Sequence, residues 1–243
     1  MKPRAIEASP RLYARIAGAL YLIIIAGGLF AEMFVRDKLI VSGDAAATGK
    51  RIMAFEPLWR AGFCATLVML ICAVVVLLIL YVLLRPVNEN IALLAVFFNL
   101  VSISIEGFND LHHFAAVLIL NGADYLKAFE PRQLDALAYL SLRLFNRGYD
   151  TSLVFFGFFC IFIGVLIFKS GFFPRFLGVL MVIAGLCYVT NSFIHFLSST
   201  FTLFPYILMP AGVAELLLAL WLVVVGVNVP RWKEQASAAR VGA

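Results

Sequence analysis

Six long apolar runs, separated by polar links, constrain this chain more than any other feature of its sequence. They cover residues 13–34, 62–84, 91–120, 149–168, 176–197 and 206–227. A helix needs about 20 mostly apolar residues to cross the hydrocarbon core of a bilayer, and every run meets that length. Backbone N–H and C=O groups cannot stay unpaired in hydrocarbon, so we expect each run to be helical. The sequence therefore predicts an all-α, polytopic integral membrane bundle of about six transmembrane helices, with both termini on the same side.

The composition excludes an ordinary soluble domain. Of the 243 residues, 63% are hydrophobic and 14% are charged, whereas soluble domains average about 45–50% and about 25%. A soluble fold of this size has too little interior to bury so much apolar surface. The net charge of +5 does not indicate nucleic-acid binding, because the basic residues stand at the ends of the runs, where they anchor helices to headgroups. We expect the lipid bilayer as a partner and no nucleic acid.

The links between the runs indicate one transmembrane domain over residues 1–230. The pairs Glu56-Pro57 and Glu130-Pro131 suggest turns into short surface helices. Residues 135–144 are mixed enough in polarity to lie along the membrane interface. The Ala- and Gly-rich segment 231–243 is expected to be a disordered tail.

The distribution of basic residues discriminates weakly between the two orientations. Ten Lys and Arg residues would lie on the side of the termini and nine on the other side. The first helix often dominates orientation, and its amino end carries Arg11 and Arg15. We therefore expect cytoplasmic termini in a bacterial inner membrane.

Three stretches carry a resemblance to a known family. They are Arg15-Ile16-Ala17-Gly18, Leu80-Tyr81-Val82-Leu83-Leu84-Arg85-Pro86-Val87-Asn88, and the segment from Leu153-Val154-Phe155-Phe156-Gly157 through Lys169-Ser170-Gly171-Phe172-Phe173-Pro174-Arg175-Phe176-Leu177-Gly178. Together they resemble the bacterial multi-pass membrane family catalogued as domain of unknown function 4386. The resemblance implies the same helix count and carries no settled activity.

Ionisable and amide residues inside the third run suggest a site. An ionisable group in a span costs about 2.5–3.5 kcal/mol on insertion scales, so each calls for a reason. Glu106, Asn109, Asp110 and His113 follow the i, i+3, i+4, i+7 pattern and share one face of a helix. We therefore treat these four residues as candidate ligand contacts.

Further polar residues fall in the same half of the predicted bundle, opposite the termini. They are Arg143, Arg147 and Asp150 entering the fourth run, Asn191 and His195 in the fifth, and Glu215 in the sixth. Helix direction alternates, so the ends of odd-numbered helices lie beside the starts of even-numbered ones. The sequence predicts a polar cavity that opens on the non-cytoplasmic side.

Several chemistries remain open for these residues. His113, His195 and Asp110 could hold a transition metal, since imidazole and carboxylate both suit such ions. The alternatives are hydrogen-bonded packing of the histidines, a proton relay or contact with a ligand. Arg143 and Arg147 could pair with Asp150, Glu32 or Glu106, or hold an anionic headgroup. Glu215 is either paired or protonated, and a kink is expected at Pro210.

The sequence favours a membrane protein that binds or transports a small molecule or lipid in this cavity. The alternatives are a structural or regulatory membrane subunit, and a membrane enzyme with a His/Asp metal or acid–base site. No phosphate-binding glycine loop and no Gly-x-Ser-x-Gly elbow occurs in the sequence.

Overall fold

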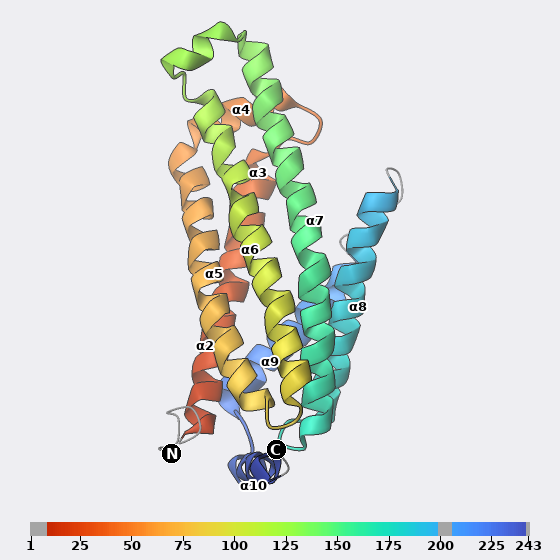
Figure 1. The fold of residues 1–243 in the computed structure, drawn as a ribbon. Coiled ribbons are helices and arrows are strands. Elements are labelled where there is room, and N and C mark those ends of the chain that lie inside the picture. Colours follow the sequence, from red (N-terminus) through yellow and green to blue (C-terminus); the bar gives the residue numbers. More distant parts are fainter. Residues whose placement is uncertain (1–8, 199–205, 242–243) are drawn as a thin grey trace. The chain divides into compact units, whose positions relative to one another are not determined.

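The fold is a set of long apolar helices. The computed structural model describes residues 9–198 and 206–241, and every regular element in these ranges is a helix (Figure 1). Six helical segments are long and apolar enough to cross a membrane: Pro10–Leu39, Glu56–Leu84, Glu89–Leu120, Pro131–Ser170, Arg175–Leu197 and Tyr206–Val224. The prediction of a polytopic α-helical membrane protein is confirmed.

The first span is composite, and the short helices α4 and η2 occupy two of the links. The elements are α2 (Pro10–Leu29), the π-helix η1 (Phe30–Arg36), α3 (Asp37–Leu39), α4 (Ala45–Ala54), α5 (Glu56–Leu84), α6 (Glu89–Leu120), η2 (Asp124–Ala128), α7 (Pro131–Ser170), α8 (Arg175–Leu197), η3 (Tyr206–Leu208), α9 (Met209–Val224) and α10 (Val229–Val241).

Large apolar side chains are exposed along the spans. Ile71 is 68% exposed, Phe97 57% and Leu78 56%. Soluble proteins rarely leave apolar patches of this extent in contact with water. Lipid chains would cover these side chains in a bilayer, so the surface fits the membrane setting that the run lengths predict.

Two helices differ from the sequence expectation in extent. The segment 135–144, expected to lie at the interface, is part of the continuous 40-residue helix α7. Proline is accepted at the first helical position, and no further proline interrupts the chain between Pro131 and Pro174. Pro210 lies in the first turn of α9 instead of kinking the helix.

The chain divides into two compact units, each built from segments that are distant in the sequence. Unit 1 comprises Met1–Ile23, Cys72–Ile103 and Asp150–Ala243, and unit 2 comprises Ile24–Ile71 and Ser104–Tyr149. Helices α2, α5, α6 and α7 each contribute to both units. Hydrophobic runs reveal where helices lie along the chain, but they do not reveal which half of a helix packs with which neighbours.

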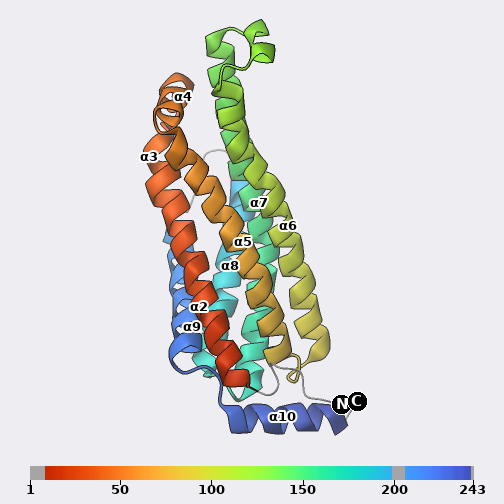
Figure 2. The ribbon, with the colours of Figure 1, turned by 90° about the vertical axis from the view of Figure 1, so that its left-hand side faces the viewer.

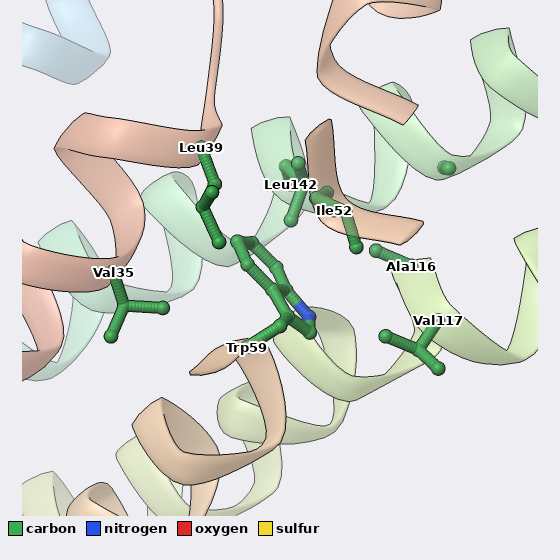
Figure 3. Packing of buried hydrophobic residues seen from close by; sticks show 8 residues of the cluster. Val35, Leu39, Ile52, Trp59, Ala116, Val117 and Leu142 are labelled. Atoms are coloured by element: carbon green, nitrogen blue, oxygen red, sulfur yellow. The ribbon is translucent and has the colours of Figure 1, made fainter. Parts of the chain in front are cut away.

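The core of unit 2 surrounds Trp59 (Figure 3). This side chain of α5 is fully buried among Val35, Leu39, Ile52 and Leu142, with Ala116, Val117 and Ala138 completing the cluster. The cluster joins η1, α3, α4, α5, α6 and α7, so it fixes the part of α6 that carries Asp110 and His113.

Glycines allow close helix contacts in unit 1. A Cβ atom on Gly178 of α8 would lie 2.6 Å from the carbonyl oxygen of Gly164 on α7. A Cβ atom on Gly18 of α2 would lie 2.7 Å from Cβ of Leu222 on α9. Small residues that let helix backbones approach are typical of membrane bundles.

The segment expected to be a disordered tail contains the helix α10. Gly226, with φ of 72°, ends the α9 region and turns the chain, and in Figure 2 α10 lies across the direction of α9. Asn228 Oδ1 accepts from the Arg231 N–H at 3.3 Å, and the Trp232 indole donates to the Leu83 carbonyl at 2.9 Å. This cap and the buried Trp232 supply the order that composition alone does not indicate. Residues 242 and 243 lie outside the described residues.

Candidate functional site

The polar face of α6 is buried in unit 2. Asn109 is 3% exposed, and Asp110 and His113 are both 0% exposed. Phe108 and Leu111, which point elsewhere on the helix, are exposed. Since residues one turn apart share a helix face, Asn109, Asp110 and His113 lie together on a side of α6 that faces the interior of the unit.

His113 contacts Trp59 of α5 through both its ring and its backbone carbonyl. Its Nε2 lies 3.2 Å from the Trp59 carbonyl oxygen, and the Trp59 indole N–H donates to the His113 carbonyl at 3.0 Å. The two rings are stacked, with centroids 4.0 Å apart. A carbonyl oxygen only accepts, so the Nε2 contact assigns the ring proton to Nε2. In the neutral ring Nδ1 is then an acceptor, and it has no hydrogen-bond partner among the residues that the structure describes.

Asp110 presents two further acceptors with no partner. Both carboxyl oxygens are buried and make no hydrogen bond within the described part of the chain. Buried polar atoms are nearly always hydrogen-bonded, so each exception needs an explanation. Asp110 and His113 are three residues apart on α6, where side chains are neighbours. Three acceptor atoms without donors therefore lie on one turn of the helix.

Acidic side chains outnumber basic ones around this turn. The guanidinium of Arg36 interacts electrostatically with both Glu106 and Asp110. It also donates through Nε to Glu32 Oε2 at 2.6 Å and lies 5.0 Å from the centroid of the Phe145 ring. Arg36 also interacts electrostatically with Asp37, so one cation is shared among four carboxyl groups.

The π-helix η1 places Arg36 at this position. Seven residues, Phe30–Arg36, adopt the wider turn, and the Asp37 N–H reaches back to the Glu32 carbonyl. Turns of π-helix occur mostly as short insertions and often mark functional sites. The Arg36 side chain is only 12% exposed.

Helix α7 holds the other side of α6 in unit 2. Asn109 Nδ2 donates to the Phe145 carbonyl at 2.8 Å, and Ser141 Oγ donates to the His112 carbonyl at 2.6 Å. A Cβ atom on Gly148 would overlap the Asn109 amide, so glycine leaves the space that this amide needs. These contacts fix the rotation of α6 and keep its polar face buried.

A second polar pair lies in unit 1. His195 Nδ1 of α8 is 3.0 Å from Asp150 Oδ1 of α7. One turn before His195, the buried Asn191 has a side-chain oxygen without a hydrogen-bond partner. A carboxylate on one imidazole nitrogen orients the ring and fixes its tautomer.

Glu215 is the centre of a hydrogen-bonded cluster in unit 1. The Tyr21 hydroxyl of α2 donates to Oε2 at 3.0 Å, and the Tyr188 hydroxyl of α8 donates to Oε1. Glu215 itself belongs to α9, so its carboxyl group joins three helices. The carboxyl group is therefore hydrogen-bonded to one hydroxyl group from each of two other helices.

The structure divides the ten candidate residues between the two units. Glu106, Asn109, Asp110, His113, Arg143 and Arg147 lie in unit 2, whereas Asp150, Asn191, His195 and Glu215 lie in unit 1. Arg143 and Arg147 are exposed. Glu32 pairs with Arg36, and Asp150 with His195. Within residues 9–198 and 206–241, no group of three or more His, Cys, Asp or Glu side chains is arranged to hold a metal ion.

Four residues around these sites were not predicted: Arg36, Trp59, Tyr21 and Tyr188. Arg36 follows Glu32 by four residues, which is the spacing of an ion pair on a helix. Trp59 and the two tyrosines lie in or beside apolar runs, where an aromatic residue gives no signal of its hydrogen-bond partner.

One protein family matches most of this chain. A family described as domain of unknown function (DUF4386) matches residues 16–226. The chain belongs to this family. The DUF4386 match includes both units' polar residues and ends before α10. A relative from Archaeoglobus fulgidus, described as an uncharacterized protein, is 29% identical over 157 residues, which is 65% of this chain and 78% of the relative. No solved structure matches.

Proposed function

We propose that this DUF4386 protein is a multi-pass protein of the cytoplasmic (inner) membrane that binds a small hydrogen-bond-donating cation at Asp110 and His113. The observation that carries the proposal is the Asp110 carboxyl group, which is 0% exposed and has no hydrogen-bond partner on either oxygen. A carboxyl group buried in this way stays ionised only when a donor or a cation lies beside it.

The acceptor set favours a ligand with several N–H or O–H groups. Asp110 offers two oxygens, and His113 offers Nδ1. The Trp59 contact holds the imidazole in place, so the ligand would not have to order it. A primary ammonium group has three donors on one nitrogen and matches this set.

The charge balance favours a cation over a neutral donor. Arg36 is shared among four carboxyl groups, so a bound monocation would bring the cluster closer to neutrality. Transport of such a solute, and a polar cavity that admits it from the non-cytoplasmic side, are part of the same proposal. The metal set of His113, His195 and Asp110 stays a prediction.

A thermal-shift experiment with two cations tests the proposal. The probes are methylammonium chloride and tetramethylammonium chloride at equal ionic strength, added to the purified full-length protein in detergent. They carry the same charge, but tetramethylammonium has no N–H donor. We expect methylammonium to raise Tm by a few degrees more than tetramethylammonium, because a ligand that binds only the folded state stabilises it.

The Asp110→Asn variant should lose this difference between the two cations. Asp124→Asn is the matched control, because Asp124 is an exposed carboxylate of the same unit. An equal response to both cations in the wild-type protein, or an Asp110→Asn response that equals the control, would refute binding at Asp110.

A structural or regulatory role is the second candidate, and the Glu215 cluster favours it. Here a membrane carboxylate is satisfied by two tyrosines from different helices, which is an arrangement that specifies packing. A third candidate, a membrane enzyme, draws on the Asp150–His195 pair, whose geometry would suit a general base.

A further inference from the structure

Unit 1 carries the whole net charge of the protein. Its sequence segments contain ten Lys and Arg residues against five Asp and Glu residues, whereas those of unit 2 contain nine against nine. The net charge of +5 therefore belongs to unit 1 alone.

Six exposed cations lie at one end of unit 1, and we call them the basic face: Arg11, Arg15, Lys169, Arg175, Arg231 and Lys233. Contacts tie this end together. Arg15 donates to the Val224 carbonyl at the end of α9, at 3.1 Å. Arg231 donates to the Gly171 carbonyl between α7 and α8, also at 3.1 Å.

Helix α10 holds two of these cations at the level where the spans end. Trp232 is 3% exposed, and its indole donates to the Leu83 carbonyl in the last turn of α5. Figure 2 shows α10 crossing the direction of α2 and α9, as expected for a helix that lies along a membrane surface. Arg231 and Lys233, on either side of Trp232, are exposed.

We propose that the basic face binds the headgroups of anionic phospholipids in the cytoplasmic leaflet. Guanidinium and ammonium groups both bind phosphate, and an anionic leaflet attracts basic residues held near its surface. Glu89 and Glu234 are the exposed carboxylates among the elements at this end, so the face stays strongly positive. This inference does not depend on the ligand proposed for Asp110.

Native mass spectrometry of the detergent-purified full-length protein tests the inference. The protein is mixed with equal amounts of phosphatidylglycerol and phosphatidylcholine that have the same acyl chains, and the bound lipids are counted. The test variant is Lys169→Gln/Lys233→Gln, and the matched control is Lys50→Gln/Lys127→Gln, which removes the same charge from exposed lysines of unit 2. Lys169→Arg/Lys233→Arg keeps the charge of the basic face.

We expect the wild-type protein, the control and the arginine variant to prefer phosphatidylglycerol. In the glutamine variant, the preference for phosphatidylglycerol over phosphatidylcholine should fall about fivefold for each cation removed. Equal preference in the test and control variants would overturn the inference. Wild-type protein that binds heparin but does not distinguish the two lipids would also overturn it, and would assign the basic face to a soluble polyanion.

Discussion

Trp59 and Trp221 differ in the hydrogen bonding of their indole N–H groups. The Trp59 N–H donates to the His113 carbonyl inside unit 2, whereas the Trp221 N–H of α9 has no hydrogen-bond partner among residues 9–198 and 206–241. Phenylalanine removes the donor and keeps an aromatic ring. We therefore expect Trp59→Phe to lower the free energy of unfolding by about 1–3 kcal/mol, because it leaves a buried carbonyl without this donor.

Trp221→Phe is the comparison for that measurement, since it removes a donor that makes no hydrogen bond. Unfolding of the detergent-solubilised variants by SDS titration would give both values. A Trp221→Phe effect as large as that of Trp59→Phe would mean that ring volume, and not the hydrogen bond, sets the stability.

Arg36 is the residue on which the charge balance of unit 2 depends. Its replacement by Gln would leave Glu32, Glu106 and Asp110 without their shared cation, so we expect Arg36→Gln to lower the free energy of unfolding by about 1–3 kcal/mol. Adding Glu32→Gln should restore part of the loss, because it removes one of the carboxylates. An additive double variant would argue against a shared charge cluster.

At the scale of elements, the contact between α7 and α8 depends on glycine. A Cβ atom on Gly178 would lie 2.6 Å from backbone atoms of Gly164 and Phe168, which cannot move away as a side chain can. We expect Gly178→Ala to destabilise the protein by about 1–3 kcal/mol.

Gly212→Ala on α9 should have the opposite effect. Apart from its chain neighbours and the backbone of its own helix, no atom of the described residues lies within 4 Å of the added Cβ at this position. Alanine in a helix is favoured over glycine by about 0.5–1 kcal/mol. Thermal unfolding of the two variants in the same detergent measures both. If Gly178→Ala left the stability unchanged, the two helices would separate easily at this contact.

The elements were mostly predictable from the sequence, and the exceptions share a cause. Run lengths alone predict six spans, because hydrocarbon thickness sets the length of a helix that crosses it. Run lengths do not reveal the π-turn at Phe30–Arg36 or the unbroken length of α7, because hydrocarbon thickness sets neither of them. Arg36, which ends this turn with its side chain only 12% exposed, was not among the predicted site residues.

At the scale of the molecule, helical spacing in the sequence identified the polar residues of one helix face. It did not identify which residues from other helices lie beside them. Asn109, Asp110 and His113 share a buried face, as the periodicity of one helix predicts. Their relation to residues on other helices needs the packing, which divides the candidates between two units. Trp59 lies on α5 and Arg36 on η1. Hydropathy does not show which part of these helices packs against α6.

The six-span topology predicts which surfaces each aqueous phase can reach. We expect a cysteine at Ser237 in α10 to be labelled from the cytoplasmic side, and a cysteine at Asp124 in η2 from the opposite side, in protein whose four native cysteines are replaced. A membrane-impermeant maleimide applied to intact cells and to inverted vesicles measures this. Labelling of both positions from the same side would contradict the six-span arrangement.

The central claim is that Asp110 binds a cation through N–H donors, and an equilibrium binding isotherm tests it most directly. Radiolabelled methylammonium is measured by scintillation proximity on the purified wild-type protein and on Asp110→Asn and Asp124→Asn. We predict saturable binding of one methylammonium per chain that is lost only in Asp110→Asn. Binding that does not saturate, or that is the same in all three proteins, would contradict the proposed site.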